Sequence, residues 1–96
     1  MALLIRGGRI ITATEDYTAD VYAEHETVTR IEPRIDDKLL APGTEIVEAR
    51  GKYVFPGFID PHVHIYLPFM GAYAADDYVS ASKAALAGGT TTLIEM

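Results

Sequence analysis

The first half of the chain alternates short runs of β-branched and apolar residues with turn residues. Two such runs flank Gly7-Gly8 in residues 3–12 and predict a hairpin, because glycine adopts positive φ without steric cost. Residues 19–33 predict a second hairpin, and residues 45–55 two further short strands around an Arg-Gly pair. The pattern therefore predicts a series of short antiparallel strands.

The pattern changes after residue 55, where a Pro-Gly pair interrupts it. Residues 58–65 (FIDPHVHI) are mostly apolar without alternation, as in a strand covered on both faces. An apolar loop is predicted for residues 65–74. Residues 76–89 predict a helix that begins at a capping aspartate and ends at a Gly-Gly pair. Because residues 90–96 again favour a strand, this half predicts a parallel βαβ unit.

Composition narrows the function classes. The chain has 96 residues, which suits a small core, and hydrophobic residues make up 49% of it. Its net charge of −6 disfavours nucleic acid and anionic membrane surfaces as partners. The absence of cysteine excludes disulfides and thiolate metal ligands. With no apolar run of membrane-spanning length and no signal-peptide pattern at the N-terminus, we expect a cytoplasmic protein without a membrane partner.

Two histidines one residue apart are the strongest chemical feature. On a strand, residues i and i+2 share a face with Cα atoms about 6.6 Å apart, so Asp60, His62 and His64 lie on one side. Two imidazoles at that spacing can converge on one metal ion, and the aspartate can orient an imidazole from behind. The simpler alternative is a pair of histidines that only make hydrogen bonds on a half-buried strand.

The segments VFPGFIDPHVHI and KAALAGGTTTLIEM closely resemble the amidohydrolase superfamily, and within it the dihydropyrimidinase and D-hydantoinase family of cyclic amidases. The resemblance implies a mixed fold. Residues 1–55 are expected to be an N-terminal antiparallel β-sandwich segment. Residues 56–96 are expected to begin a TIM-type (β/α)8 barrel with its first strand, first helix and second strand, the barrel being incomplete in this chain.

The resemblance also implies a function. His62 and His64 would bind one of two divalent metal ions, usually zinc, with Asp60 behind them. A carboxylated lysine, two more histidines and a proton-shuttle aspartate would lie beyond Met96, so no catalytic residue is assigned here. The family hydrolyses a ring amide C–N bond of hydantoins or dihydropyrimidines with a metal-bridging hydroxide. We expect a cyclic amide or imide substrate, a homo-oligomer (a tetramer by resemblance), and no activity from the 96-residue piece alone.

Hydantoinases carry a hydrophobic substrate gate after the first strand, which by resemblance corresponds to Leu67, Phe69 and Met70. The alternative is that these side chains pack against a neighbouring element or subunit. Dihydroorotases usually have arginine at the position of Tyr66, which disfavours that activity. An allantoinase, or a non-enzymatic dihydropyrimidinase-like scaffold protein, remains the alternative function. Retention of both histidines favours an enzyme.

Overall fold

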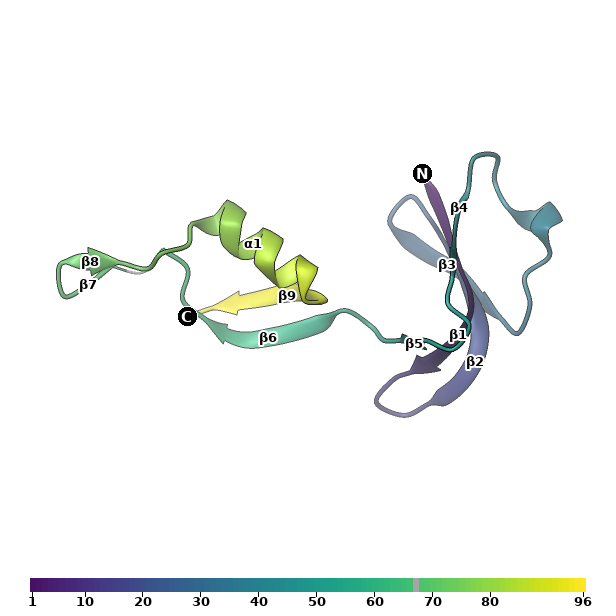
Figure 1. Cartoon of the computed structure of the whole chain (residues 1–96), viewed down its shortest axis with the longest axis horizontal. Helices are drawn as coiled ribbons and strands as arrows, with labels where there is room; N and C mark the ends of the chain where they lie inside the picture. The colour runs from purple at the N-terminus through teal and green to yellow at the C-terminus, as the bar shows by residue number, and fades with distance from the viewer. Residues whose placement is uncertain (67) are drawn as a thin grey trace. The chain divides into compact units, whose positions relative to one another are not determined.

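The computed structural model describes residues 1–66 and 68–96, with only the backbone of Phe69. Contacts divide the chain into two compact units, Met1–Pro56 and Gly57–Met96, and each is described by itself (Figure 1). Within the described residues, no helix has the length and apolar character needed to cross a membrane.

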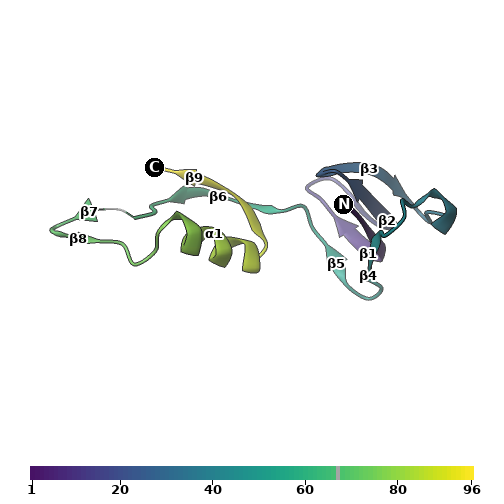
Figure 2. The same ribbon diagram turned by 90° about the horizontal axis from the view of Figure 1, so that it is seen from above.

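Unit 1 is built on one five-stranded sheet with strand order β3-β2-β1-β4, in which β5 also pairs with β1 (Figure 2). Its elements are β1 (Ala2–Ile11), β2 (Asp16–Glu24), β3 (Thr27–Glu32), the 3-10 helix η1 (Asp37–Leu39), β4 (Glu45–Glu48) and β5 (Tyr53–Val54). The predicted turn at His25-Glu26 joins β2 to β3, and both of its residues have positive φ, as a two-residue hairpin turn requires.

The prediction that all these strands are antiparallel is wrong in part. The β1–β2 and β2–β3 pairs are antiparallel, whereas β4 and β5 pair with β1 in parallel. The segment after β3 carries η1 and returns the chain to the free edge of β1 in the direction of β1. A parallel pair needs such a crossover, and local turn signals do not report it.

The predicted hairpin at Gly7-Gly8 is also wrong, because β1 runs through both glycines as one strand. The pairing of β1 with β2 shifts between Ile5 and Gly8, so that two β1 residues lie opposite Asp20. Gly7 has a φ of 72°, which identifies it as the left-handed residue of a β-bulge. The glycine pair therefore bends a strand instead of reversing the chain.

A buried apolar core of unit 1 lies on one face of this sheet. Leu4, Tyr22 and Ile35 form its buried apolar cluster. Beside it, the buried Asp20 carboxylate accepts hydrogen bonds from the Gly7 N–H (2.8 Å) and the Ile35 N–H (2.9 Å). The segment that follows β3 is therefore fixed to the sheet through both Ile35 and this carboxylate.

Unit 2 pairs β6 (Phe58–Val63) in parallel with β9 (Thr90–Glu95). The helix α1 (Tyr78–Ala87) connects them in sequence and lies along the strand pair (Figures 1 and 2). Its boundaries follow from local chemistry: Asp77 accepts a hydrogen bond from the Ser80 N–H at 2.9 Å, and the helix ends at Gly88. The predicted helix is thus confirmed with Asp77 as its N-cap.

The segment predicted as an apolar loop contains a small hairpin. The two-residue strands β7 (Pro68–Phe69) and β8 (Ala72–Tyr73) are antiparallel. Met70 and Gly71 form the turn between them, with φ values of 51° and 79°. Positive φ at both turn positions matches the right-handed twist of adjacent strands, which explains why a reversal occurs here.

Candidate metal site

The end of β6 is shaped by Pro61. Between Asp60 and Val63 the pairing with β9 shifts, so that β6 contains one residue more than its partner from Leu93 to Glu95. Proline has no N–H to donate, and such interruptions of a parallel or antiparallel ladder bend the strand and redirect its side chains. His62 lies within this irregular stretch, and His64 follows the last residue of the strand.

The two imidazoles face each other. Their Nε2 atoms are 3.3 Å apart, the ring centroids are separated by 5.1 Å, and the ring planes meet at 83°. Both side chains are exposed in unit 2. The two rings therefore lie close together, as their spacing in the sequence suggested. Their role as metal ligands stays a prediction.

The distance between the two nitrogens suits a shared cation. Two nitrogen ligands at about 2.0–2.1 Å from a tetrahedral zinc ion lie roughly 3.3–3.4 Å apart. The same separation also permits a hydrogen bond in which one Nε2 carries a proton and the other accepts it. The described residues contain no cluster of three or more histidine, aspartate or glutamate side chains arranged to hold a metal. The pair is therefore a two-donor site.

Acidic groups lie near the histidines along the chain and at the end of the neighbouring strand. The Asp60 carboxylate accepts a hydrogen bond from the backbone N–H of His62 at 3.2 Å. This bond restrains the backbone conformation between the two residues. Glu95 is paired in register with Val63. Its carboxylate accepts a hydrogen bond from the Tyr78 hydroxyl at 2.7 Å, and this bond raises the pKa of Tyr78.

The predicted gate residues lie on the β7–β8 hairpin or beside it. Leu67 lies outside the described residues, as does the side chain of Phe69. Met70 occupies the turn and is 90% exposed. The role of these three residues toward a substrate stays a prediction.

Sequence reasoning missed an aromatic contact beside the site. The Tyr66 ring stacks on the Tyr73 ring with centroids 4.9 Å apart and planes at 20°. Tyr66 has a φ of 54°, unusual for a residue other than glycine, and its N–H donates to the Asp76 carbonyl at 3.1 Å. The signal that could have found this contact is Gly71 between two short apolar runs, which predicts the turn that brings the tyrosines together.

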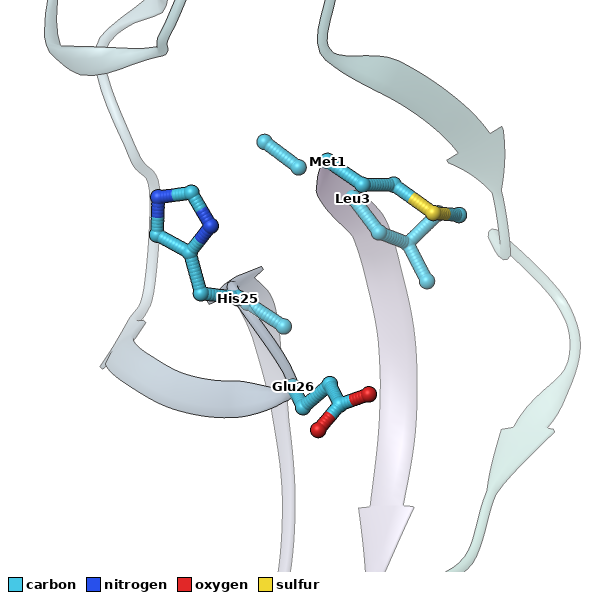
Figure 3. A pocket seen from close by; sticks show the side chains of 6 residues that line it. Met1, Leu3, His25 and Glu26 are labelled. Atoms are coloured by element: carbon cyan, nitrogen blue, oxygen red, sulfur yellow. The ribbon is translucent and has the colours of Figure 1, made fainter.

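A cavity of about 550 Å³ belongs to unit 1 and not to the histidine pair (Figure 3). Met1 and Leu3 from the start of the chain line it together with His25 and Glu26 of the β2–β3 turn. The His25 N–H donates to the Met1 carbonyl at 3.2 Å, which joins the two sides of the cavity. With one imidazole and one carboxylate, its lining does not supply a three-ligand metal site.

Known proteins share both the sequence and the fold. The Amidohydrolase family profile matches residues 53–96, which include both histidines. A D-hydantoinase from Geobacillus stearothermophilus is 43% identical over 95 residues, and a dihydropyrimidinase from Rattus norvegicus is 44% identical over 98 residues. The chain is therefore similar to the amidohydrolase family. Its relatives in this family include dihydropyrimidinases and D-hydantoinases, as the sequence predicted.

Structural comparison agrees with this similarity. The crystal structure of a D-hydantoinase from Thermus sp. matches 98% of the chain with a TM-score of 0.89 and 63% identity. The chain covers 20% of that structure, 19% of the Geobacillus protein and 18% of the rat protein. The chain therefore spans about a fifth of the length of these relatives.

Proposed function

We propose that this chain is part of a metal-dependent cyclic amidohydrolase that opens the ring amide bond of hydantoins or dihydropyrimidines. The observation that carries the proposal is the separation of 3.3 Å between Nε2 of His62 and Nε2 of His64, which equals the spacing of two ligands on one tetrahedral ion. The names of the relatives support the substrate class, since they are dihydropyrimidinases and D-hydantoinases.

A divalent metal would be held by His62 and His64, and when bound it would act as a Lewis acid toward an amide carbonyl and lower the pKa of water. A histidine binds a metal only through an unprotonated nitrogen, so Nε2 of both residues must be free of a proton. The metal would take the place of the proton that one Nε2 can donate to the other in a hydrogen bond. Asp60 restrains the backbone at His62 through its hydrogen bond to the N–H. Nitrogen ligands suit zinc, which we propose as one of two metals in the complete site.

We propose further that residues 1–55 belong to an N-terminal β-sandwich and residues 56–96 begin a (β/α)8 barrel. In this proposal β6, α1 and β9 are the first strand, helix and second strand of the barrel. Parallel pairing of β6 with β9 and the position of α1 between them in sequence support this. The similarity to a D-hydantoinase structure across 98% of the chain supports it independently.

Barrel architecture would explain why the histidines lie at the carboxyl end of β6, because (β/α)8 enzymes place their chemistry at that end of the strands. A cytoplasmic location and a homo-oligomer, with the tetramer implied by resemblance, complete the proposal. The gate formed by Leu67, Phe69 and Met70 also belongs to it.

A metal titration of the 96-residue chain tests the histidine pair. Zinc added to the labelled protein should shift the imidazole resonances of His62 and His64 together and leave His25 unchanged, with weak affinity because two ligands are fewer than zinc normally uses. The variants His62→Ala and His64→Ala should each abolish the coupled shift, whereas the control His25→Ala should preserve it. An unchanged response in the first two variants would contradict the assignment.

Activity is tested best in a chimera. The segment of the Thermus D-hydantoinase that matches this chain is replaced by the 96 residues, which is feasible at 63% identity. The chimera should open a hydantoin ring, and His62→Ala or His64→Ala in it should lower the rate by at least about a hundredfold, because loss of metal removes the Lewis acid. A folded, metal-loaded chimera without hydantoin hydrolysis would refute the proposed activity. The isolated chain should show no turnover.

A further inference from the structure

We propose that unit 1 carries a binding pocket for a small phosphate-class anion, separate from the histidine pair. We define this basic pocket by Arg9, Arg50, Lys52 and Tyr53, with Thr18 at its edge. Its volume is about 390 Å³, within the range of small-molecule sites. It lies wholly within Met1–Pro56, so its geometry is set by one compact unit.

Strand register builds one wall of the basic pocket. Arg9 on β1 is paired with Thr18 on β2 and with Tyr53 on β5, so these three residues lie side by side across the sheet. The side chains of all three residues are exposed to solvent. A hydroxyl, a guanidinium and an aromatic ring therefore line the outer face of the sheet.

A tight turn supplies the second wall. The Lys52 N–H donates to the Ala49 carbonyl at 2.9 Å, and Gly51 has a φ of 77°, as the third position of a type II turn requires. This turn separates β4 from β5 and presents Arg50 and Lys52 on either side of the glycine. A Cβ atom placed on Gly7 would come within 2.9 Å of Cγ of Arg50, so the arginine side chain lies directly over the β1 bulge.

The balance of charge in the basic pocket indicates the class of ligand. Arg9 is neutralised by Asp16, which accepts two hydrogen bonds from its guanidinium at 2.7 and 2.8 Å. Within unit 1, the side chains of Arg50 and Lys52 make no hydrogen bond or ion pair. These two cations leave a charge of +2 uncompensated in a chain whose net charge is −6. A phosphate group, which carries about −1.5 to −2 charges at pH 7, is the matching partner.

The Tyr53 ring provides a way to distinguish an organic phosphate from inorganic phosphate as the ligand. Tyr53 is 61% exposed, with the Arg9 guanidinium 5.5 Å from its ring centroid and the Phe55 ring at 5.9 Å. An organic phosphate monoester would gain apolar contact with this ring, whereas inorganic phosphate would use the cations and the Thr18 hydroxyl alone. Inorganic phosphate and phenyl phosphate therefore serve as the two probes.

The test is an NMR titration of the ¹⁵N-labelled 96-residue chain with each probe. Saturable shifts are expected at the amides of Arg50, Gly51 and Lys52, and stronger binding above about pH 6, where the phosphate becomes a dianion. A lower dissociation constant for phenyl phosphate would identify a monoester as the ligand, and equal constants would identify phosphate itself. Chloride at the same ionic strength should produce no saturable shift.

A pair of charge-matched variants decides whether the basic pocket is the site. The double variant Arg50→Gln/Lys52→Gln should raise the dissociation constant by at least about tenfold, because both uncompensated cations are lost. The control Arg30→Gln/Lys38→Gln removes the same charge outside the basic pocket and should change the constant less than twofold. Dispersed amide spectra would establish that each variant is folded. If the double variant Arg50→Gln/Lys52→Gln does not fold, the single variants Arg50→Gln and Lys52→Gln are titrated in its place. Equal weakening in both pairs, or shifts without saturation, would overturn the proposal.

Discussion

The buried carboxylate of Asp20 is the most sensitive position in unit 1. Its Oδ1 accepts from the Gly7 N–H, and its Oδ2 accepts from the Ile35 N–H and from Nε of Arg6 at 3.5 Å. In Asp20→Asn one carboxylate oxygen becomes an amino group, so one buried N–H loses its acceptor and Arg6 loses a counterion. Arg6 keeps its ion pair with Asp37 at 2.9 Å, so the expected cost is that of leaving a buried hydrogen-bonding group unsatisfied, about 1–3 kcal/mol.

That cost is a large part of the stability available to the unit, since whole domains unfold with only about 5–15 kcal/mol. Urea denaturation of the 96-residue chain, followed by the amide resonances of Leu4 and Tyr22, measures it. The control Asp16→Asn makes the same chemical change on the same strand, where the carboxylate is exposed and pairs with Arg9. It should shift the urea midpoint much less. Equal shifts in the two variants would refute the assignment of the Asp20 network.

The same carboxylate predicts an acid dependence of stability. Burial acts to raise the pKa of Asp20, but the N–H groups of Ile35 and Gly7 and the charge of Arg6 outweigh it, so the pKa is lowered. Its contribution is complete above about pH 4, the pKa of an unfolded aspartate, and is lost as the pH falls through the lower folded value. Between these two values the wild-type chain should lose stability on acidification faster than Asp20→Asn does. Parallel pH profiles would contradict this reasoning.

Two further substitutions test unit 2. In Gly57→Ala the new Cβ would overlap Oγ1 and Cγ2 of Thr91 on β9. The strands β6 and β9 would have to move apart, which should cost about 1–3 kcal/mol, measured by amide exchange in β9. Loss of the helix cap in Asp77→Ala should increase amide exchange in the first turn of α1. Because hydrogen bonds from the Ser80 backbone and side chain lower the pKa of Asp77, the wild-type cap should weaken in the same way below about pH 4. Unchanged exchange would contradict either prediction.

Local sequence patterns predicted much of the fold correctly. The β2–β3 hairpin, the helix α1 with its capping aspartate and the strand β9 all appear where periodicity and turn residues indicated them. These features depend on contacts within a few residues, so the sequence reports them directly. The His-x-His spacing is a local signal as well, but the shifted pairing between Asp60 and Val63 and the end of β6 at Val63 interrupt the alternation from which a shared face was predicted.

Long-range pairing decided the rest. Gly7-Gly8 has the composition of a hairpin turn, but pairing with β2 on one edge and β4 on the other continues the strand through a bulge, and the Asp20 carboxylate accepts a hydrogen bond from the Gly7 N–H. Likewise, the parallel direction of β4 and β5 depends on the crossover through η1. No local signal encodes the partner of a strand.

For the candidate metal site too, the sequence determined one part and the tertiary structure another. The sequence by itself determined that His62 and His64 share the end of a strand and that nitrogen ligands suit a metal such as zinc. Only the tertiary structure decided the separation of 3.3 Å between their Nε2 atoms, because the two side chains lie where the pairing of β6 with β9 is irregular and β6 ends. A strand's sequence fixes which residues alternate to the same face, whereas its register against a neighbour fixes where those side chains meet.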